Sequence, residues 1–165
     1  MSTKNITYFG KPGLENTDAV LRLVKQRAED LNIDRIVLAS TRGGTAEKAL
    51  DVLEGKKLII VGISRERFSA DTMKRAENRG FPVLFSNETD YNYPEDMKTA
   101  FRRFSQGMKV AVEDVVIACR KGVLKEGEDV ISLAGSSWGA DTAIVINAAS
   151  EFSTVKIKEV ICMPR

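Results

Sequence analysis

Short apolar runs alternate with helix-like stretches along this chain of 165 residues, and this alternation limits the folds that it can adopt. The apolar runs are short and rich in valine, isoleucine and leucine, as β-strands are. Strands that are separated by amphipathic helices are typical of βαβ units on a largely parallel sheet. The sequence therefore predicts an α/β fold, and its length suits a single domain over residues 1–165.

The order of the expected elements also predicts how the strands run. We expect strands at residues 6–9, 35–39, 58–61, 82–85, 130–134, 143–146 and 157–162. We expect helices from Asn16 or Thr17 to Asn32 and over 45–54, 70–78, 95–105 and 108–120, with Gly107 separating the last two. No crossover helix fits between the last three strands. Antiparallel strands are therefore expected near the C-terminus of a mostly parallel sheet.

The composition argues against several classes of function. The net charge is +2 at pH 7, which is too small to indicate a nucleic-acid or membrane partner. No apolar run has transmembrane length, and residues 1–10 lack the apolar core of a signal peptide. The chain has no histidine, so a Ser-His-Asp triad is impossible and a metal site is not expected. We expect a small-molecule partner, and a homo-oligomer remains open.

Two further observations concern reactive side chains inside apolar runs. Cys119 and Cys162 form no metal-binding or redox motif, so we expect buried, unreactive thiols and a cytoplasmic protein. Glu113 and Asp114 interrupt another apolar run, and at least one of them is expected to be partly buried with a raised pKa. Such an acid is either a general base or, more often, a structural residue.

A polar segment with two glycines follows the expected strand at 35–39 and opens a helix. It consists of Ser40, Thr41, Arg42, Gly43, Gly44 and Thr45. Glycines let the backbone approach a ligand, and hydroxyls together with the first N–H groups of a helix favour an anion. The guanidinium of Arg42 can donate two hydrogen bonds to a phosphate. The alternative is a tight turn in which Thr45 only caps the helix.

A similar segment follows the expected strand at 130–134. It consists of Gly135, Ser136, Ser137, Trp138, Gly139, Ala140 and Asp141. Trp138 either stacks on a flat ligand ring or is a partly buried anchor or subunit contact. Asp141 either binds a ligand hydroxyl or ring nitrogen, or holds the turn through hydrogen bonds to the backbone.

A third strand-to-helix turn contains Lys11, Asn16 and Thr17. Lys11 could neutralise a phosphate to which Asn16 and Thr17 donate, or these residues are a solvated lysine and an ordinary helix cap. In open α/β sheets, ligands bind at the carboxyl ends of the strands. We therefore expect the turns at Gly13, Gly43 and Gly139 to meet at one rim and to bind a phosphorylated small molecule.

Taken together, four motifs resemble those of a small, functionally uncharacterised archaeal and bacterial family related to the C-terminal alpha/beta domain of pyruvate kinase. The motifs are Lys11-Pro12-Gly13 with Glu15-Asn16-Thr17, the segment 40–46, Gly139-Ala140-Asp141-Thr142-Ala143, and the segment 157–165. The resemblance covers most of the chain and is weaker over residues 64–106, which are shorter than in that family. It implies a three-layer αβα domain with a mostly parallel sheet.

The resemblance also implies a ligand. In many pyruvate kinases this domain binds a sugar bisphosphate through a loop of the type that residues 40–45 match, whereas the catalytic site lies in another domain. In the small family the implied ligand is flavin mononucleotide, whose ring would lie against Trp138 and the turn at Gly62. Three functions follow from this: a flavin mononucleotide-binding protein, a flavin-dependent oxidoreductase, or a regulatory module that senses a sugar phosphate. The sequence leaves open whether the chain is an enzyme.

Overall fold

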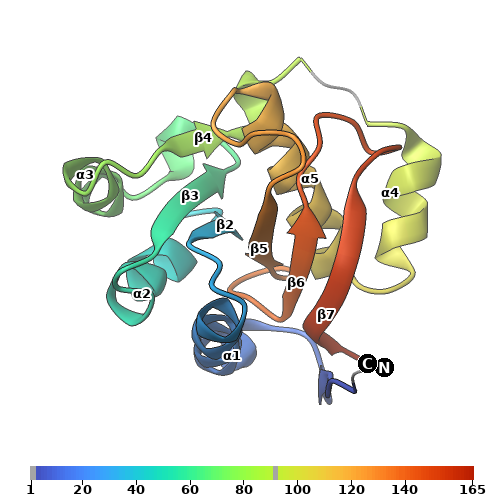
Figure 1. Cartoon of the computed structure of the whole chain (residues 1–165). Coiled ribbons are helices and arrows are strands. Elements are labelled where there is room, and N and C mark those ends of the chain that lie inside the picture. Colours follow the sequence, from blue (N-terminus) through green and yellow to red (C-terminus); the bar gives the residue numbers. More distant parts are fainter. Residues whose placement is uncertain (1–2, 91–92) are drawn as a thin grey trace.

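The computed structural model describes residues 3–90 and 93–165, and in these residues seven strands form a single sheet (Figure 1). The strands are β1 (Thr7–Phe9), β2 (Arg35–Ala39), β3 (Lys57–Gly62), β4 (Val83–Phe85), β5 (Asp129–Ala134), β6 (Thr142–Asn147) and β7 (Lys156–Pro164). Their order in the sheet is β1-β7-β6-β5-β2-β3-β4. Strand β6 pairs antiparallel with β5 and β7, and all other neighbours pair parallel. The predicted mixture of parallel and antiparallel strands is confirmed.

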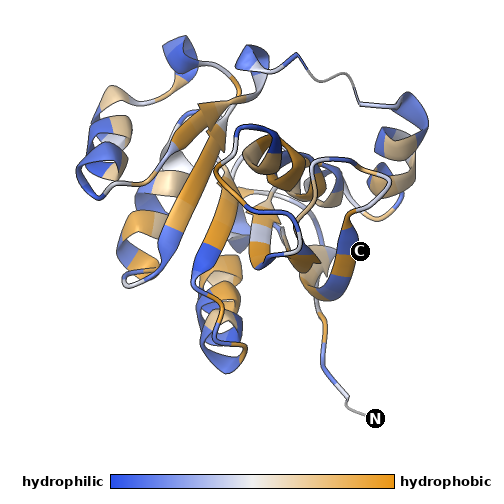
Figure 2. Cartoon of the chain, turned by 45° about the horizontal axis from the view of Figure 1, so that its top comes forward, coloured by the Kyte–Doolittle hydropathy of each residue, from blue (hydrophilic) through white to orange (hydrophobic). Residues whose placement is uncertain are grey.

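Helices cover both faces of this sheet, which confirms the three-layer αβα architecture. On one face lie α1 (Thr17–Asp30), α2 (Gly44–Val52) and α3 (Ala70–Asn78). On the other face lie α4 (Glu95–Arg102) and α5 (Gln106–Arg120). In Figure 2 the strands are largely hydrophobic, whereas the flanking helices contain both hydrophobic and hydrophilic residues. The central strands are buried on both faces, which explains their continuous apolar sequence.

The break between α4 and α5 differs from the prediction that Gly107 separates the two helices. Helix α4 already ends at Arg102, and α5 begins at Gln106 with Gly107 in its first turn. The side chain of Ser105 caps α5 by accepting a hydrogen bond from the backbone N–H of Met108 at 2.8 Å. A Cβ atom on Gly107 would lie 2.4 Å from Oγ1 of Thr142, so glycine is needed for close packing of α5 against β6.

Candidate binding site at the strand ends

A cavity of about 720 Å³ opens at the carboxyl ends of β2, β3 and β5. The segment after β2, the turn after β3, the hairpin between β5 and β6, and the first half of α5 form its walls. Helix α2, which follows β2, lies on one face of the sheet, whereas α5, which precedes β5, lies on the other. The neighbouring strands β2 and β5 therefore form a switch point of the type where α/β sheets bind ligands.

Most of the predicted site residues line this cavity. These are Ser40, Thr41, Arg42, Gly43, Gly44, Thr45, Gly62, Gly135, Ser136, Ser137, Trp138 and Gly139. The third predicted turn also contributes, because Leu14 lines the cavity and a Cβ atom on Gly139 would lie 2.8 Å from the Cα atom of Leu14. The three turns thus meet at one rim. Lys11, Asn16, Thr17, Ala140 and Asp141 do not line the cavity, although all of them lie in these turns.

The N-terminus of α2 supplies the backbone donors of the site. Gly43 precedes the helix with a φ of 98°, in the left-handed region that favours glycine, and it occupies the cap position that Thr45 was expected to take in the alternative interpretation. The hydroxyl of Ser40 accepts a hydrogen bond from the N–H of Ala46 at 3.1 Å. The N–H groups of Gly44 and Thr45 precede the first helical hydrogen bond, and a Cβ atom on Gly44 would meet nothing within 4 Å. This backbone is accessible to an anion.

Arg42 places a positive charge beside these donors. Its guanidinium carbon lies 4.6 Å from the centroid of the Trp138 ring, so a cation–π contact joins the segment after β2 to the β5–β6 hairpin. The side chain is exposed, and no ion pair found in residues 3–90 and 93–165 includes it. Its donors are free for an anionic ligand.

Another part of the rim is apolar. Leu14, Ile63 and Trp138 are large hydrophobic residues with exposed fractions of 59%, 45% and 50%, and all three line the cavity. Exposed apolar side chains that gather around one opening are typical of a ligand-binding or interaction surface.

A buried network of hydrogen bonds fixes the β5–β6 hairpin. The carboxylate of Asp141 is fully buried and accepts hydrogen bonds from the N–H of Ser136 at 3.0 Å and of Gly13 at 3.3 Å. The hydroxyl of Thr142 also donates to it at 2.8 Å. Asp141 therefore holds the turn, as the second interpretation of this residue expected, and also joins two of the three turns.

The remaining predicted residues have structural or solvent contacts. The hydroxyl of Thr17 accepts a hydrogen bond from the N–H of Ala140 at 3.0 Å, which fixes the hairpin to the start of α1. Lys11 is exposed and pairs with Glu15 at 3.1 Å, and the amide of Asn16 donates to the backbone oxygen of Lys11 at 2.9 Å. The solvated lysine of the alternative interpretation is therefore present, but Asn16 precedes α1 without a side-chain capping hydrogen bond, so the ordinary helix cap is not.

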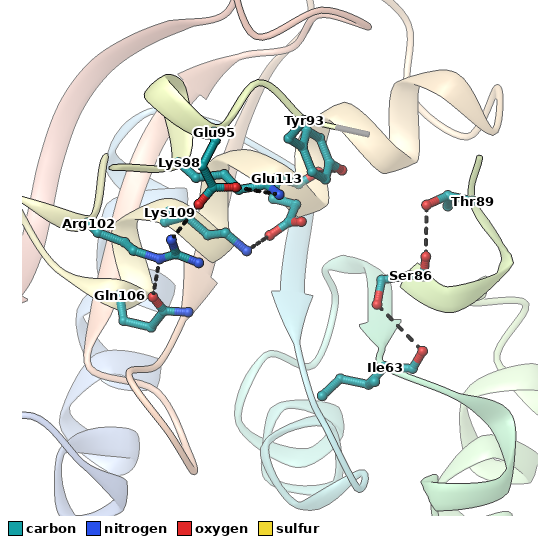
Figure 3. A network of polar contacts seen from close by, with 10 residues as sticks. All are labelled: Ile63, Ser86, Thr89, Tyr93, Glu95, Lys98, Arg102, Gln106, Lys109 and Glu113. Atoms are coloured by element: carbon teal, nitrogen blue, oxygen red, sulfur yellow. Dashed lines mark hydrogen bonds and ion pairs between the residues drawn. The ribbon is translucent and has the colours of Figure 1, made fainter. Parts of the chain in front are cut away.

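Sequence reasoning missed the wall that α5 contributes. Gln106, Lys109, Val110, Glu113 and Asp114 line the cavity from this helix. Figure 3 shows the ion pair between Lys109 and Glu113 and the hydrogen bond that the guanidinium of Arg102 donates to Gln106. The signal in the sequence was the pair of adjacent acids in an apolar run. That signal predicted burial, which is confirmed for Asp114, but not the direction in which the side chains point.

Asp114 is the most unusual group of this wall. Its side chain is 4% exposed, and its Oδ2 atom has no hydrogen-bond partner among the residues that the structure describes. Burial, and secondly the charge of Glu113, raises the pKa of the Asp114 carboxyl well above its ordinary value, while Lys109 acts in the opposite direction. This carboxyl is therefore a neutral acid over a wider pH range than an exposed aspartate.

Other reactive groups lie elsewhere. Cys119 and Cys162 are free and buried, and burial raises the pKa of their thiols to about 11 and about 12. The prediction of unreactive thiols is consistent with these values. In the part of the chain that the structure describes, no three His, Cys, Asp or Glu side chains gather in a way that could hold a metal ion. No helix there is both long and apolar enough to cross a membrane.

Comparison with known proteins agrees with the architecture. The family described as the pyruvate kinase alpha/beta domain matches residues 18–146. Among solved structures, a pyruvate kinase from Cryptosporidium parvum is 16% identical, with a TM-score of 0.52 over 81% of this chain and 23% of that one. A second structure of the enzyme from this organism is 17% identical, with a TM-score of 0.51 over 84% of this chain and 23% of that one. A third structure, in complex with ADP, is 17% identical, with a TM-score of 0.50 over 93% of this chain and 25% of that one.

These identities are low, so the likeness to solved structures shows the fold alone. The chain spans about a quarter of the length of the pyruvate kinases that it matches.

Proposed function

The chain belongs to the family of the pyruvate kinase alpha/beta domain, and from this premise we propose that it binds a phosphorylated small molecule, with flavin mononucleotide as the first candidate. One observation carries the proposal. A single cavity joins the N-terminus of α2 and Arg42, which forms no ion pair among the described residues, to an exposed apolar rim. A ligand that has both an anion and a flat ring would use both parts.

The phosphate would lie at the α2 end of the cavity. The N–H groups of Gly44 and Thr45 and the partial positive charge of the helix terminus favour a dianion there. The hydroxyl of Thr41 and the guanidinium of Arg42 add side-chain donors on the same segment. Backbone N–H groups at a helix N-terminus, together with hydroxyl and guanidinium donors, can bind a phosphate without a lysine or a metal ion.

The ring would lie against the apolar rim formed by Leu14, Ile63 and Trp138. A volume of about 720 Å³ is within the range of small-molecule and cofactor sites. Covering these side chains removes apolar surface from water, which contributes to affinity. The cavity therefore offers contacts for both the phosphate and the ring that this proposal requires.

A bound flavin would supply hydride-transfer chemistry, and the residues named above would bind and orient it. Whether this chemistry is used decides between a flavin-binding protein and a flavin-dependent oxidoreductase. The free, buried thiols suit a reducing compartment, and we place the protein in the cytoplasm.

Titration of the purified chain into flavin mononucleotide, followed by flavin fluorescence, tests the proposal. We expect saturable quenching, and Arg42→Ala should weaken binding by about tenfold because a charge-assisted hydrogen bond is lost. Arg22→Ala is the matched control, since Arg22 is an exposed arginine on α1 that does not line the cavity. The control should bind as the unchanged protein does.

Absence of quenching at high protein concentration would overturn the flavin assignment. If a sugar phosphate then binds and changes the mass of the assembly, the regulatory function is supported instead. Bleaching of bound flavin by a nicotinamide donor would extend the proposal to an oxidoreductase.

A further inference from the structure

The wall formed by α5 contains a polar group for which the structure offers no partner. Asp114 is 4% exposed and lines the cavity, and its Oδ2 atom accepts or donates no hydrogen bond within the described residues. Polar atoms that are buried without a partner are rare because they cost free energy. Because the Asp114 residue lines a cavity, a ligand could complete this hydrogen bonding.

We propose that Asp114 is a ligand-recognition residue whose carboxyl hydrogen-bonds a polar, uncharged group at the end of the ligand remote from its phosphate. The inference rests on the proposed function, because it assumes that the phosphate lies at the N-terminus of α2. It adds which residue recognises the other end of the ligand, and the protonation state of the carboxyl that does so.

The charges around the cavity favour a neutral partner for this carboxyl. On α5 itself, the charge of Lys109 is already paired with Glu113. From other elements, Arg42 and Glu47 line the same cavity. Burial, followed by the charge of Glu113, raises the pKa of Asp114, so the protonated form has one donor and one acceptor to offer.

The same charges define the class of ligand. Among the described residues that line the α5 end, the charge of Lys109 is already paired with Glu113, so a second phosphate would find no free cation there. A carbonyl or ring N–H would instead find a hydrogen-bonding partner in Asp114. The ligand class is therefore a monophosphate with an uncharged, hydrogen-bonding ring, which a sugar bisphosphate is not.

The test compares flavin mononucleotide, riboflavin and inorganic phosphate as probes of the two ends. Asp114→Leu removes the hydrogen bond and should weaken flavin mononucleotide and riboflavin by the same factor, about tenfold. Asp114→Asn keeps a neutral donor and acceptor and should retain most of the affinity. Competition by inorganic phosphate should not change in either variant, whereas Arg42→Ala should weaken phosphate and leave riboflavin unchanged.

Ser132→Ala is the matched control for a buried substitution next to α5. The hydroxyl of Ser132 donates to the backbone oxygen of Ala111 at 2.8 Å and does not line the cavity. This control should bind all three probes as the unchanged protein does.

A pH profile supplies a second readout that a purely structural residue would not affect. The ratio of flavin affinities between the unchanged protein and Asp114→Asn should fall as pH rises and Asp114 ionises. Using the ratio cancels the ionisation of the ligand phosphate, which is common to both proteins.

The outcomes separate the two proposals. If the unchanged protein binds flavin mononucleotide but Asp114→Leu binds it equally well, the role of Asp114 is overturned and the proposed function stands. Equal loss of flavin and inorganic phosphate in Asp114→Leu would also overturn it, because the effect would be a general distortion of the cavity. If the unchanged protein binds no flavin, the flavin assignment and the role of Asp114 in flavin recognition both fail.

Discussion

Two buried aspartates at the same end of the sheet differ in whether their hydrogen bonds are satisfied. Asp141 accepts hydrogen bonds from two backbone N–H groups and one hydroxyl, and it does not line the cavity. Asp114 lines the cavity and has an oxygen without a partner in the described residues. Burial alone therefore does not identify a functional acid. The two acids differ in their unsatisfied hydrogen-bonding capacity, and this difference is the observation on which our proposal for Asp114 rests.

The largest expected effect is at Asp141. Asp141→Ala should destabilise the protein by about 3 kcal/mol, because the N–H groups of Ser136 and Gly13 lose their acceptor and the hairpin loses one of its connections to the turn at Gly13. Chemical denaturation monitored by circular dichroism measures this. An unchanged midpoint would show that the network does not hold the hairpin, and the comparison between the two aspartates would fail.

Asp114→Asn should instead stabilise the protein at neutral pH, by less than Asp141→Ala destabilises it. The raised pKa means that the folded protein binds a proton that the unfolded chain releases. Stability is therefore lost as pH rises from the ordinary value of 3.8 through the folded pKa, and the asparagine variant avoids this loss. We expect the variant to be more stable at neutral pH and equal to the unchanged protein at strongly acidic pH. A variant that is less stable at neutral pH would instead assign Asp114 a structural role.

The smallest effect is expected at Lys11, in the turn where the sequence predicted a phosphate ligand. Lys11 pairs with Glu15 in solvent and does not line the cavity. Lys11→Ala should change flavin affinity by less than about twofold, as exposed ion pairs contribute little. A loss of flavin affinity as large as that expected for Arg42→Ala would indicate that the phosphate lies nearer to the turn at Gly13.

Local patterns predicted the fold and the α2 side of the cavity. Apolar runs determine the strands, and glycines with hydroxyl residues after β2 and β5 mark the places where the backbone can approach a ligand. These signals lie within a few residues of each other. For this reason they are readable without knowledge of the tertiary structure.

The α5 side could not be predicted in the same way. Helix α5 is apolar on most of its surface, so periodicity does not define which side chains point into the cavity. Its position depends on the contact of Gly107 with Thr142 and on the hydrogen bond between Ser105 and Thr142, partners that are distant in sequence. The contact between Thr17 and Ala140 is of the same kind, and it explains why a residue expected to bind ligand supports the hairpin.

Amide chemical shifts recorded by NMR during titration with flavin mononucleotide test the location of the site most directly. The account predicts the largest changes at Gly44 and Thr45 and in the hairpin at Gly139, all of which line the cavity. Gly122 and Gly127 lie outside it and should not move. Saturable binding with shifts confined to residues outside the cavity, or no shifts at all, would contradict the account.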